Sequence, residues 1–80
     1  MTIFNKKEEI IYSILNIYFE GLDYNQIIFK LNSSYSDFMF NNLDDILENG
    51  ILIGRISKAN SSFKITDLGK KHLHRLINLE

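Results

Sequence analysis

In the first half of the chain, apolar residues recur every three or four positions, which is the spacing of an amphipathic helix. The first helix is expected from about Lys6 to Phe19. Asn5 and Glu8 have the spacing of a capping box, in which two side chains satisfy free amide groups at a helix start. Gly21 is placed to end this helix in a left-handed conformation. The predicted buried stripe consists of Ile10, Ile11, Ile14, Leu15 and Tyr18.

Two further helices are predicted to follow. The second runs from Asp23, a suitable N-cap, to about Asn32. The polar run at 32–34 then predicts a turn and a new N-cap. The third helix is expected from there to Glu48, and Gly50 is expected to end it. The inner faces of these two helices are predicted to carry Ile27, Ile28, Leu31, Met39, Leu43, Ile46 and Leu47.

After Gly50 the period of the pattern changes from helical to alternating. Two short alternating runs, 51–56 and 62–65, are joined by a polar stretch at 57–61, which predicts a β-hairpin. Thr66 is then expected to cap a last helix, and Asp67 favours the positive end of that helix.

The resulting order is helix, helix, helix, hairpin, helix, which predicts an α+β, mainly helical fold. A tight turn between the second and third helices suggests a helix-turn-helix, and a hairpin directly after the third helix corresponds to a wing. The expected fold is a winged helix-turn-helix with three helices, a two-stranded wing and a C-terminal helix. It is expected to form a single domain over 1–80, with the helix-turn-helix at about 23–49, the wing at about 51–65 and the C-terminal helix at about 66–79.

Two segments resemble the small archaeal winged-helix DNA-binding proteins. The first, LDDILENGIL at 43–52, is similar to the leucine-spaced end of the third helix in that family. The second, FKITDLGKKHL at 63–73, is similar to the family pattern of an aromatic, an aliphatic, a threonine, a glycine and a further aliphatic residue. The resemblance covers nearly the whole chain from Glu9. The chain departs from the family at Gln26, where a basic residue is common, and the turn before the third helix is expected to be one residue longer.

The resemblance implies binding to double-stranded DNA by a transcriptional regulator or a chromatin-associated protein. The third helix would lie in the major groove and the wing would reach the DNA backbone. Phosphate contacts are then expected from basic residues of the wing and the last helix, namely Arg55, Lys58, Lys64, Lys70 and Lys71. Base readout is expected from polar residues of the turn and the third helix, namely Tyr35, Ser36, Asn41 and Asn42.

The charge distribution supports an alternative function. The net charge is −1, and residues 1–50 carry three lysines and eight acidic residues, whereas residues 51–80 carry six basic and two acidic residues. The predicted third helix has no lysine or arginine, and Asp44, Asp45 and Glu48 would repel DNA if they faced it. The alternative is therefore a winged-helix protein-protein interaction module that does not bind DNA, and an ordinary solvated polar surface explains the third helix equally well.

The last helix is also a candidate for dimerisation. Leu68, His72, Leu76 and Leu79 lie on one side of it, whereas Leu73 and Ile77 turn toward another side. A stripe of this width could cover the domain's own core and still meet a second copy. The resemblance likewise implies a homodimer through this helix. The alternative is that the whole apolar side of this helix packs against the core of its own domain, with His72 as part of that packed side.

The remaining residues suggest little chemistry. The aromatic residues Phe19, Tyr24, Phe29, Tyr35 and Phe38 are expected mostly in the core rather than stacked on single-stranded nucleic acid. The chain has no cysteine, and its two histidines diverge on a helix, so neither a metal site nor a cofactor is expected. No catalytic motif, small-molecule ligand site, signal peptide or membrane span is evident. The chain is therefore expected to be a cytoplasmic protein without enzymatic activity.

Overall fold

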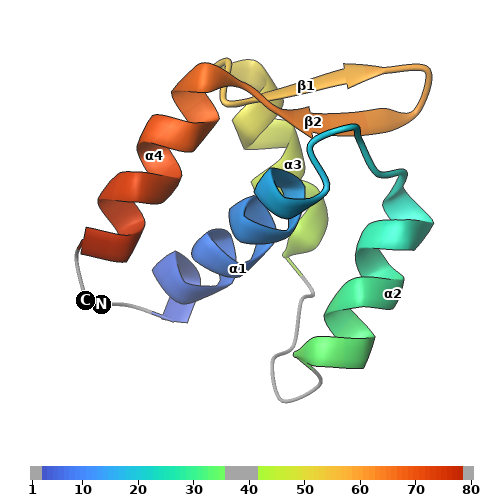
Figure 1. The fold of residues 1–80 in the computed structure, drawn as a ribbon, viewed down its shortest axis with the longest axis horizontal. Coiled ribbons are helices and arrows are strands. Elements are labelled where there is room, and N and C mark those ends of the chain that lie inside the picture. Colours follow the sequence, from blue (N-terminus) through green and yellow to red (C-terminus); the bar gives the residue numbers. More distant parts are fainter. Residues whose placement is uncertain (1–2, 36–41, 79–80) are drawn as a thin grey trace.

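Four helices and one two-stranded antiparallel sheet make up the described part of the fold, which is α+β and mainly helical. The computed structural model describes residues 3–35 and 42–78. Helix α1 lies in the middle, with α4 on one side of it and α2 on the other, and the hairpin crosses one end (Figure 1). In chain order the elements are α1 (Ile3–Ile17), α2 (Tyr24–Ser34), α3 (Leu43–Leu52), β1 (Ile56–Ala59), β2 (Ser62–Ile65) and α4 (Asp67–Asn78).

Helix α1 begins earlier than its sequence pattern suggests. It starts at Ile3 rather than near Lys6, so Asn5 lies inside the helix and the predicted capping box is wrong. Glu8 is instead buried, with 7% of its surface exposed, and its carboxylate contacts His72 of α4. A tertiary contact between distant residues therefore explains this acidic residue better than local capping does.

The start of α2 was predicted correctly, and its hydrogen bonds show why. The Asp23 carboxylate accepts from the Gln26 amide at 2.8 Å, and the Gln26 side chain accepts from the Asp23 amide at 2.9 Å. This capping box satisfies two amide groups that have no partner inside the helix. The helix continues to Ser34, past the predicted turn, because Leu31 is buried and its carbonyl accepts from the Tyr35 amide at 2.8 Å.

The third helix lies later in the chain than predicted. The prediction that it starts directly after Ser34 is wrong, because Tyr35 has an irregular backbone conformation and α3 begins at Leu43. Residues 36–41, which include Met39 of the predicted inner face, lie outside the described residues. Leu43, Ile46 and Leu47 are buried as expected.

Gly54, not Gly50, ends α3. Gly54 has a φ of +81°, its amide donates to the Ile51 carbonyl at 3.2 Å, and the Arg55 amide donates to the Gly50 carbonyl at 2.8 Å. These two bonds form a Schellman motif, which requires a left-handed residue. Gly50 lies inside the helix, where the side chains of Ile56 and Tyr12 leave no room for a Cβ, which would lie 2.6 and 2.7 Å from them.

The hairpin is shorter and tighter than predicted. Strand β1 begins at Ile56 rather than Ile51, and the turn contains only Asn60 and Ser61, both with positive φ. The pairing of Ala59 with Ser62 fixes the register. Two successive positive φ angles are typical of a type I′ turn, which matches the twist of the strands.

A third segment pairs with the hairpin. Leu22, between α1 and α2, forms an antiparallel bridge with Phe63, with backbone hydrogen bonds of 2.8 and 3.0 Å. Gly21 permits this close approach, because a Cβ at that position would lie 2.2 Å from the Ser62 hydroxyl and φ is +114°. The bridge attaches the start of α2 to the hairpin.

Thr66 caps α4 as predicted. Its hydroxyl accepts from the Gly69 amide at 3.1 Å and donates to the Gly54 carbonyl at 2.6 Å, so one side chain joins the start of α4 to the end of α3. Leu73 and Leu76 are buried, whereas Leu68 and Ile77 are exposed.

The core is aliphatic, with few aromatic residues. It is built mainly from isoleucine and leucine of α1, α2 and α3, together with Tyr12 and Phe63. The expectation that the other aromatic residues fill the core is wrong for Phe19 and Phe29, which are 66% and 70% exposed. Tyr24 is also exposed, Tyr35 is half-buried against the core, and Phe38 lies outside the described residues. The predicted core residue Tyr18 is 43% exposed and instead lies under the Lys30 ammonium, 3.8 Å from its ring centre.

Candidate nucleic-acid interface

The two lysines of the hairpin lie on opposite faces of it. Lys58 pairs with Phe63 and Lys64 pairs with Ser57, and directly paired residues share a face, whereas neighbours along a strand alternate. The Lys58 ammonium accordingly lies 5.2 Å from the centre of the Phe63 ring. Lys64 lies on the other face beside Gly21, where its Cε is 3.2 Å from the position of a Cβ. The hairpin therefore presents one cation on each side.

Four basic side chains gather on the exposed side of α4. Lys70, Lys71, His74 and Arg75 surround a shallow depression of about 510 Å³, and all four are exposed. We call these four residues the basic face of α4. Within the described residues, none of them forms an ion pair. The charges of Lys70, Lys71 and Arg75 are therefore open to solvent or to a ligand.

Arg55 lies apart from the hairpin lysines. Its backbone is fixed on both sides, because its amide donates to Gly50 at 2.8 Å and its carbonyl accepts from the Thr66 amide at 3.1 Å. Its side chain turns toward α4, where Nη1 lies 3.3 Å from Nε2 of His72. The candidate phosphate contacts thus fall into separate groups, with Lys58 and Lys64 on the hairpin, Lys70 and Lys71 on α4, and Arg55 beside His72.

A polar cluster forms where α1, α4 and the residue before β1 meet. Its members are Glu8, Tyr12, Arg55 and His72. The His72 ring hydrogen-bonds to the Glu8 carboxylate and packs edge-on against Tyr12, with ring centres 5.4 Å apart. Burial and the nearby Glu8 carboxylate raise the pKa of Tyr12 to about 12, although Arg55 acts in the opposite direction. The hydroxyl of Tyr12 therefore stays protonated through the neutral range.

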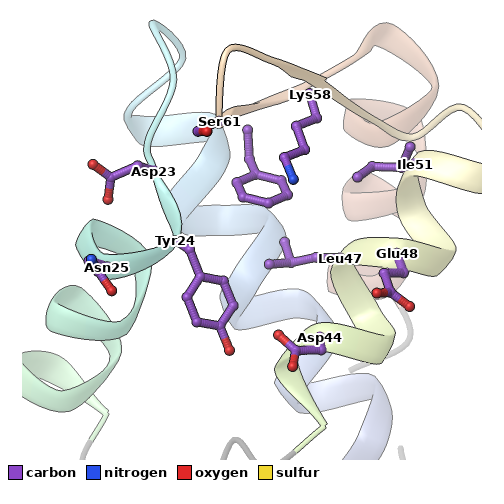
Figure 2. A pocket seen from close by; sticks show the side chains of 10 residues that line it. Asp23, Tyr24, Asn25, Asp44, Leu47, Glu48, Ile51, Lys58 and Ser61 are labelled. Carbon is purple, nitrogen blue, oxygen red and sulfur yellow. The ribbon is translucent and has the colours of Figure 1, made fainter.

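The solvent side of α3 faces an acidic groove. Figure 2 shows this groove between the start of α2, the outer side of α3 and the hairpin. Its volume is about 470 Å³, and Leu47, Ile51 and Phe63 supply apolar lining. The carboxylates of Asp23, Asp44 and Glu48 line it against a single cation, Lys58, and the remaining lining residues are Tyr24, Asn25 and Ser61.

Tyr24 connects the two helices across this groove. Its hydroxyl points toward the Asp44 carboxylate, and the interaction between these two side chains raises the pKa of Tyr24 (Figure 2). The interaction joins the first residue of α2 to the first turn of α3. This role of Tyr24 was not predicted, because it depends on how the two helices pack.

The candidate base-reading residues that the structure describes, Tyr35 and Asn42, are only partly exposed to solvent. Tyr35 is half-buried against the core, and Asn42 is half-buried with a side-chain oxygen that has no hydrogen-bond partner among the described residues. Ser36 and Asn41 lie outside the described residues.

The candidate dimer residues differ widely in exposure. Leu76 is 3% exposed in the single chain, His72 is half-buried by its contacts with Glu8 and Tyr12, and Leu68 is 55% exposed. Leu79 lies outside the described residues. Leu68 is therefore the one described member of the set with a largely free side chain.

The chain matches no known protein-family model, no curated protein and no solved structure. None of the helices in the described ranges has the length and apolar character needed to cross a membrane. Within the same ranges, histidine, aspartate and glutamate side chains form no group of three that could hold a metal ion.

Proposed function

We propose that this protein is a winged helix-turn-helix protein that binds double-stranded DNA. The observation that carries the proposal is the basic face of α4, where exposed cations gather without acidic partners among the described residues. Such cations can neutralise DNA phosphates and release the counterions held there, which supplies most of the affinity of non-specific DNA binding.

The arrangement of the elements supports the same proposal. Helices α2 and α3 are followed at once by a hairpin, and the bridge between Leu22 and Phe63 ties that hairpin to the start of α2. A hairpin in this position corresponds to the wing of a winged helix-turn-helix. Lys58 and Lys64 would add phosphate contacts from the two faces of the wing.

The acidic groove argues against an approach through α3. Asp44 and Glu48 on the outer side of α3, and Asp23 at the start of α2, would repel phosphates. We therefore place the main contact on Lys70, Lys71 and Arg75 of α4. Such a protein would act in the cytoplasm as a transcriptional regulator or as a chromatin-associated protein.

The test is fluorescence anisotropy with a labelled generic duplex at several salt concentrations. The logarithm of the binding constant should fall linearly with the logarithm of salt concentration, by about 0.9 per phosphate contact. The double variant Lys70→Ala/Lys71→Ala should make that slope shallower by about 1.8. Lys30→Ala on α2 is the control, because the Lys30 ammonium lies over the ring of Tyr18, just after α1, and not on α4. Absence of binding at low salt would reject the proposal.

A second pair of variants tests the orientation. Asp44→Asn combined with Glu48→Gln removes two carboxylates from the acidic groove without changing the size of the side chains. If DNA lies along α4, the affinity should rise only slightly through the change in net charge. A rise of tenfold or more, with a changed salt slope, would place α3 against the DNA instead.

The acidic groove favours a second candidate function, a protein-protein interaction module. Its apolar lining and three carboxylates fit a partner segment that carries an aliphatic side chain between basic ones. A short labelled peptide of alternating lysine and leucine should then shift the amide resonances of Leu47 and Ile51, whereas a glutamate-leucine peptide should not. Equal shifts with both peptides, or none with either, would reject this candidate.

A further inference from the structure

We propose that a cleft between α4 and the start of β1 binds a phosphate group. The cleft has a volume of about 460 Å³ and is lined by Arg55, His72, Arg75, Leu76 and Asn78. We call it the Arg55–Arg75 cleft. It contains both arginines of the chain, which lie twenty positions apart in the sequence.

The side chains of the cleft come from two directions. His72, Arg75 and Asn78 are three residues apart on α4, so they follow one flank of that helix. Arg55 faces them from the connection between α3 and β1. A guanidinium group presents N–H donors in a planar fork that matches two phosphate oxygens, and the Asn78 amide can add another donor.

Arg55 is held in place but has unused donors. Its backbone is fixed by hydrogen bonds to Gly50 and Thr66. The Arg55 backbone therefore does not have to become ordered when a ligand binds. Within the described residues, its guanidinium has no carboxylate partner, and its one side-chain hydrogen-bond contact is with Nε2 of His72 at 3.3 Å.

That contact with His72 does not satisfy Arg55. Nε2 of His72 also bonds to the Glu8 carboxylate, and a ring nitrogen carries either one proton or one lone pair. When Nε2 donates its proton to Glu8, it cannot accept from Arg55. The N–H groups of Arg55 are then available to a ligand, whereas the Glu8 carboxylate accepts a hydrogen bond from His72.

The charge balance of the cleft favours an anion. Two guanidinium groups line it, and the Glu8 carboxylate that contacts His72 is 7% exposed and already hydrogen-bonded. The aliphatic Leu76 side chain and the volume of the cleft leave space for the organic part of a phosphate ester. The phosphate group could belong to a free anion or to the DNA backbone, and only the second source rests on the proposed function.

Inorganic phosphate is the first probe. Thermal unfolding of the protein should be followed against phosphate concentration, with sodium chloride added to hold the ionic strength constant. Binding to the native state raises Tm in a saturable way. Arg55→Gln and Arg75→Gln should each weaken the apparent affinity by at least tenfold, and Arg55→Lys should retain only part of it, since the fork is lost. Lys30→Gln on α2, which does not line the cleft, should keep the wild-type affinity for phosphate.

Amide resonances locate the ligand in the same titration. Phosphate should shift the resonances of Arg55, Arg75 and Asn78 and leave those of the hairpin turn unchanged. Because Arg75 is exposed, Arg75→Gln tests the site even if Arg55→Gln fails to fold.

A duplex DNA arm separates the two sources. If the DNA backbone supplies the phosphate, Arg55→Gln should make the salt slope of duplex binding shallower by about 0.9. If phosphate protects the wild type in an arginine-dependent way but no duplex binds, the cleft is a free-anion site and only the DNA proposal fails. Equal protection of wild type and both arginine variants, together with an unchanged salt slope, would overturn the proposed cleft.

Discussion

Glu8 in the first helix and His72 in the last share a hydrogen bond between a carboxylate oxygen and the Nε2 atom of the ring. Both side chains are largely buried, and the bond joins residues 64 positions apart. It therefore fixes how α4 lies against α1.

The Glu8–His72 bond should contribute measurably to stability. A double-mutant cycle with Glu8→Ala, His72→Ala and the double variant should give a coupling free energy of about 1.5–3 kcal/mol, because a hydrogen bond to a charged group is stronger than a neutral one. Urea denaturation measures each value. The Lys6–Glu9 pair on the same helix, which is more exposed, is the control and should couple by less than about 0.5 kcal/mol. Equal coupling in the two cycles would contradict the prediction.

Tyr12 should make the fold sensitive to alkaline pH. Its folded pKa is raised to about 12 from 10.0, so the unfolded chain ionises first as pH rises. The stabilisation is complete below pH 10 and is lost as pH rises toward 12, by about 2–3 kcal/mol. Urea denaturation at pH 8 and pH 11 should show a larger loss for wild type than for Tyr12→Phe. Identical losses would show that Tyr12 does not titrate differently on folding.

Ser61 is strained in the hairpin turn, where its φ is +68°. Serine in a left-handed conformation costs about 1–2 kcal/mol relative to glycine. Glycine also raises the conformational entropy of the unfolded chain, which offsets part of this gain in stability. Ser61→Gly should therefore stabilise the fold by about 0.5–1 kcal/mol and raise Tm by about 2–6 °C. The matched control is Ser57→Gly, inside β1, which should lower Tm. A lower Tm for Ser61→Gly would refute the assigned strain.

Gly69 should not tolerate a side chain. A Cβ at this position would lie 2.1 Å from the carbonyl oxygen of Arg55, which is backbone and already bonded to the Thr66 amide. Gly69→Ala should therefore destabilise the fold by about 1–3 kcal/mol, although alanine favours a helix. Lys71→Ala on the exposed side of α4 should change stability by less than about 0.5 kcal/mol. Stabilisation by Gly69→Ala, measured by thermal unfolding, would contradict this close contact.

Leu68 and Leu76 should respond differently to a charge. Leu76→Glu places a carboxylate in the core and should unfold the chain, because Leu76 is 3% exposed. Leu68→Glu should leave the fold intact and convert a homodimer through the last helix into a monomer. Circular dichroism and light scattering measure the two effects. A dimer that survives Leu68→Glu would exclude this interface, and a wild-type protein that stays monomeric would exclude the homodimer.

The order and type of the elements followed from the sequence, because helical and alternating spacing are local properties. The boundaries failed where a tertiary contact decided them. Asn49 and Gly50 are typical of a helix end, yet α3 continues through both residues. The glycine is needed there because Tyr12 and Ile56 fill the space that a side chain would occupy. Asn5 and Glu8 have the spacing of a capping box, yet the Glu8 carboxylate hydrogen-bonds to His72 in the last helix.

The candidate interface was harder to predict than the fold. Lys70 and Lys71 were identified as cations of the last helix, and the spacing of four residues to His74 and Arg75 could have revealed the whole basic face. The separation of Lys58 from Lys64 depends on a turn of two residues, which the polar stretch at 57–61 does not fix. The meeting of Arg55 with Arg75 depends on the docking of α4, which no local pattern encodes.

The small net charge of the chain conceals an uneven distribution of charge along it. Helix α4, which carries the basic face, and helix α2, whose start lines the acidic groove, lie at opposite ends of the long axis (Figure 1), which measures 33 Å. That length is about three times the distance over which 0.1 M salt screens a charge, so each end acts almost independently of the other. In the field of a polyanion the molecule would rotate before contact, with α4 leading, and its encounter rate would follow the charge of that end rather than the total of −1.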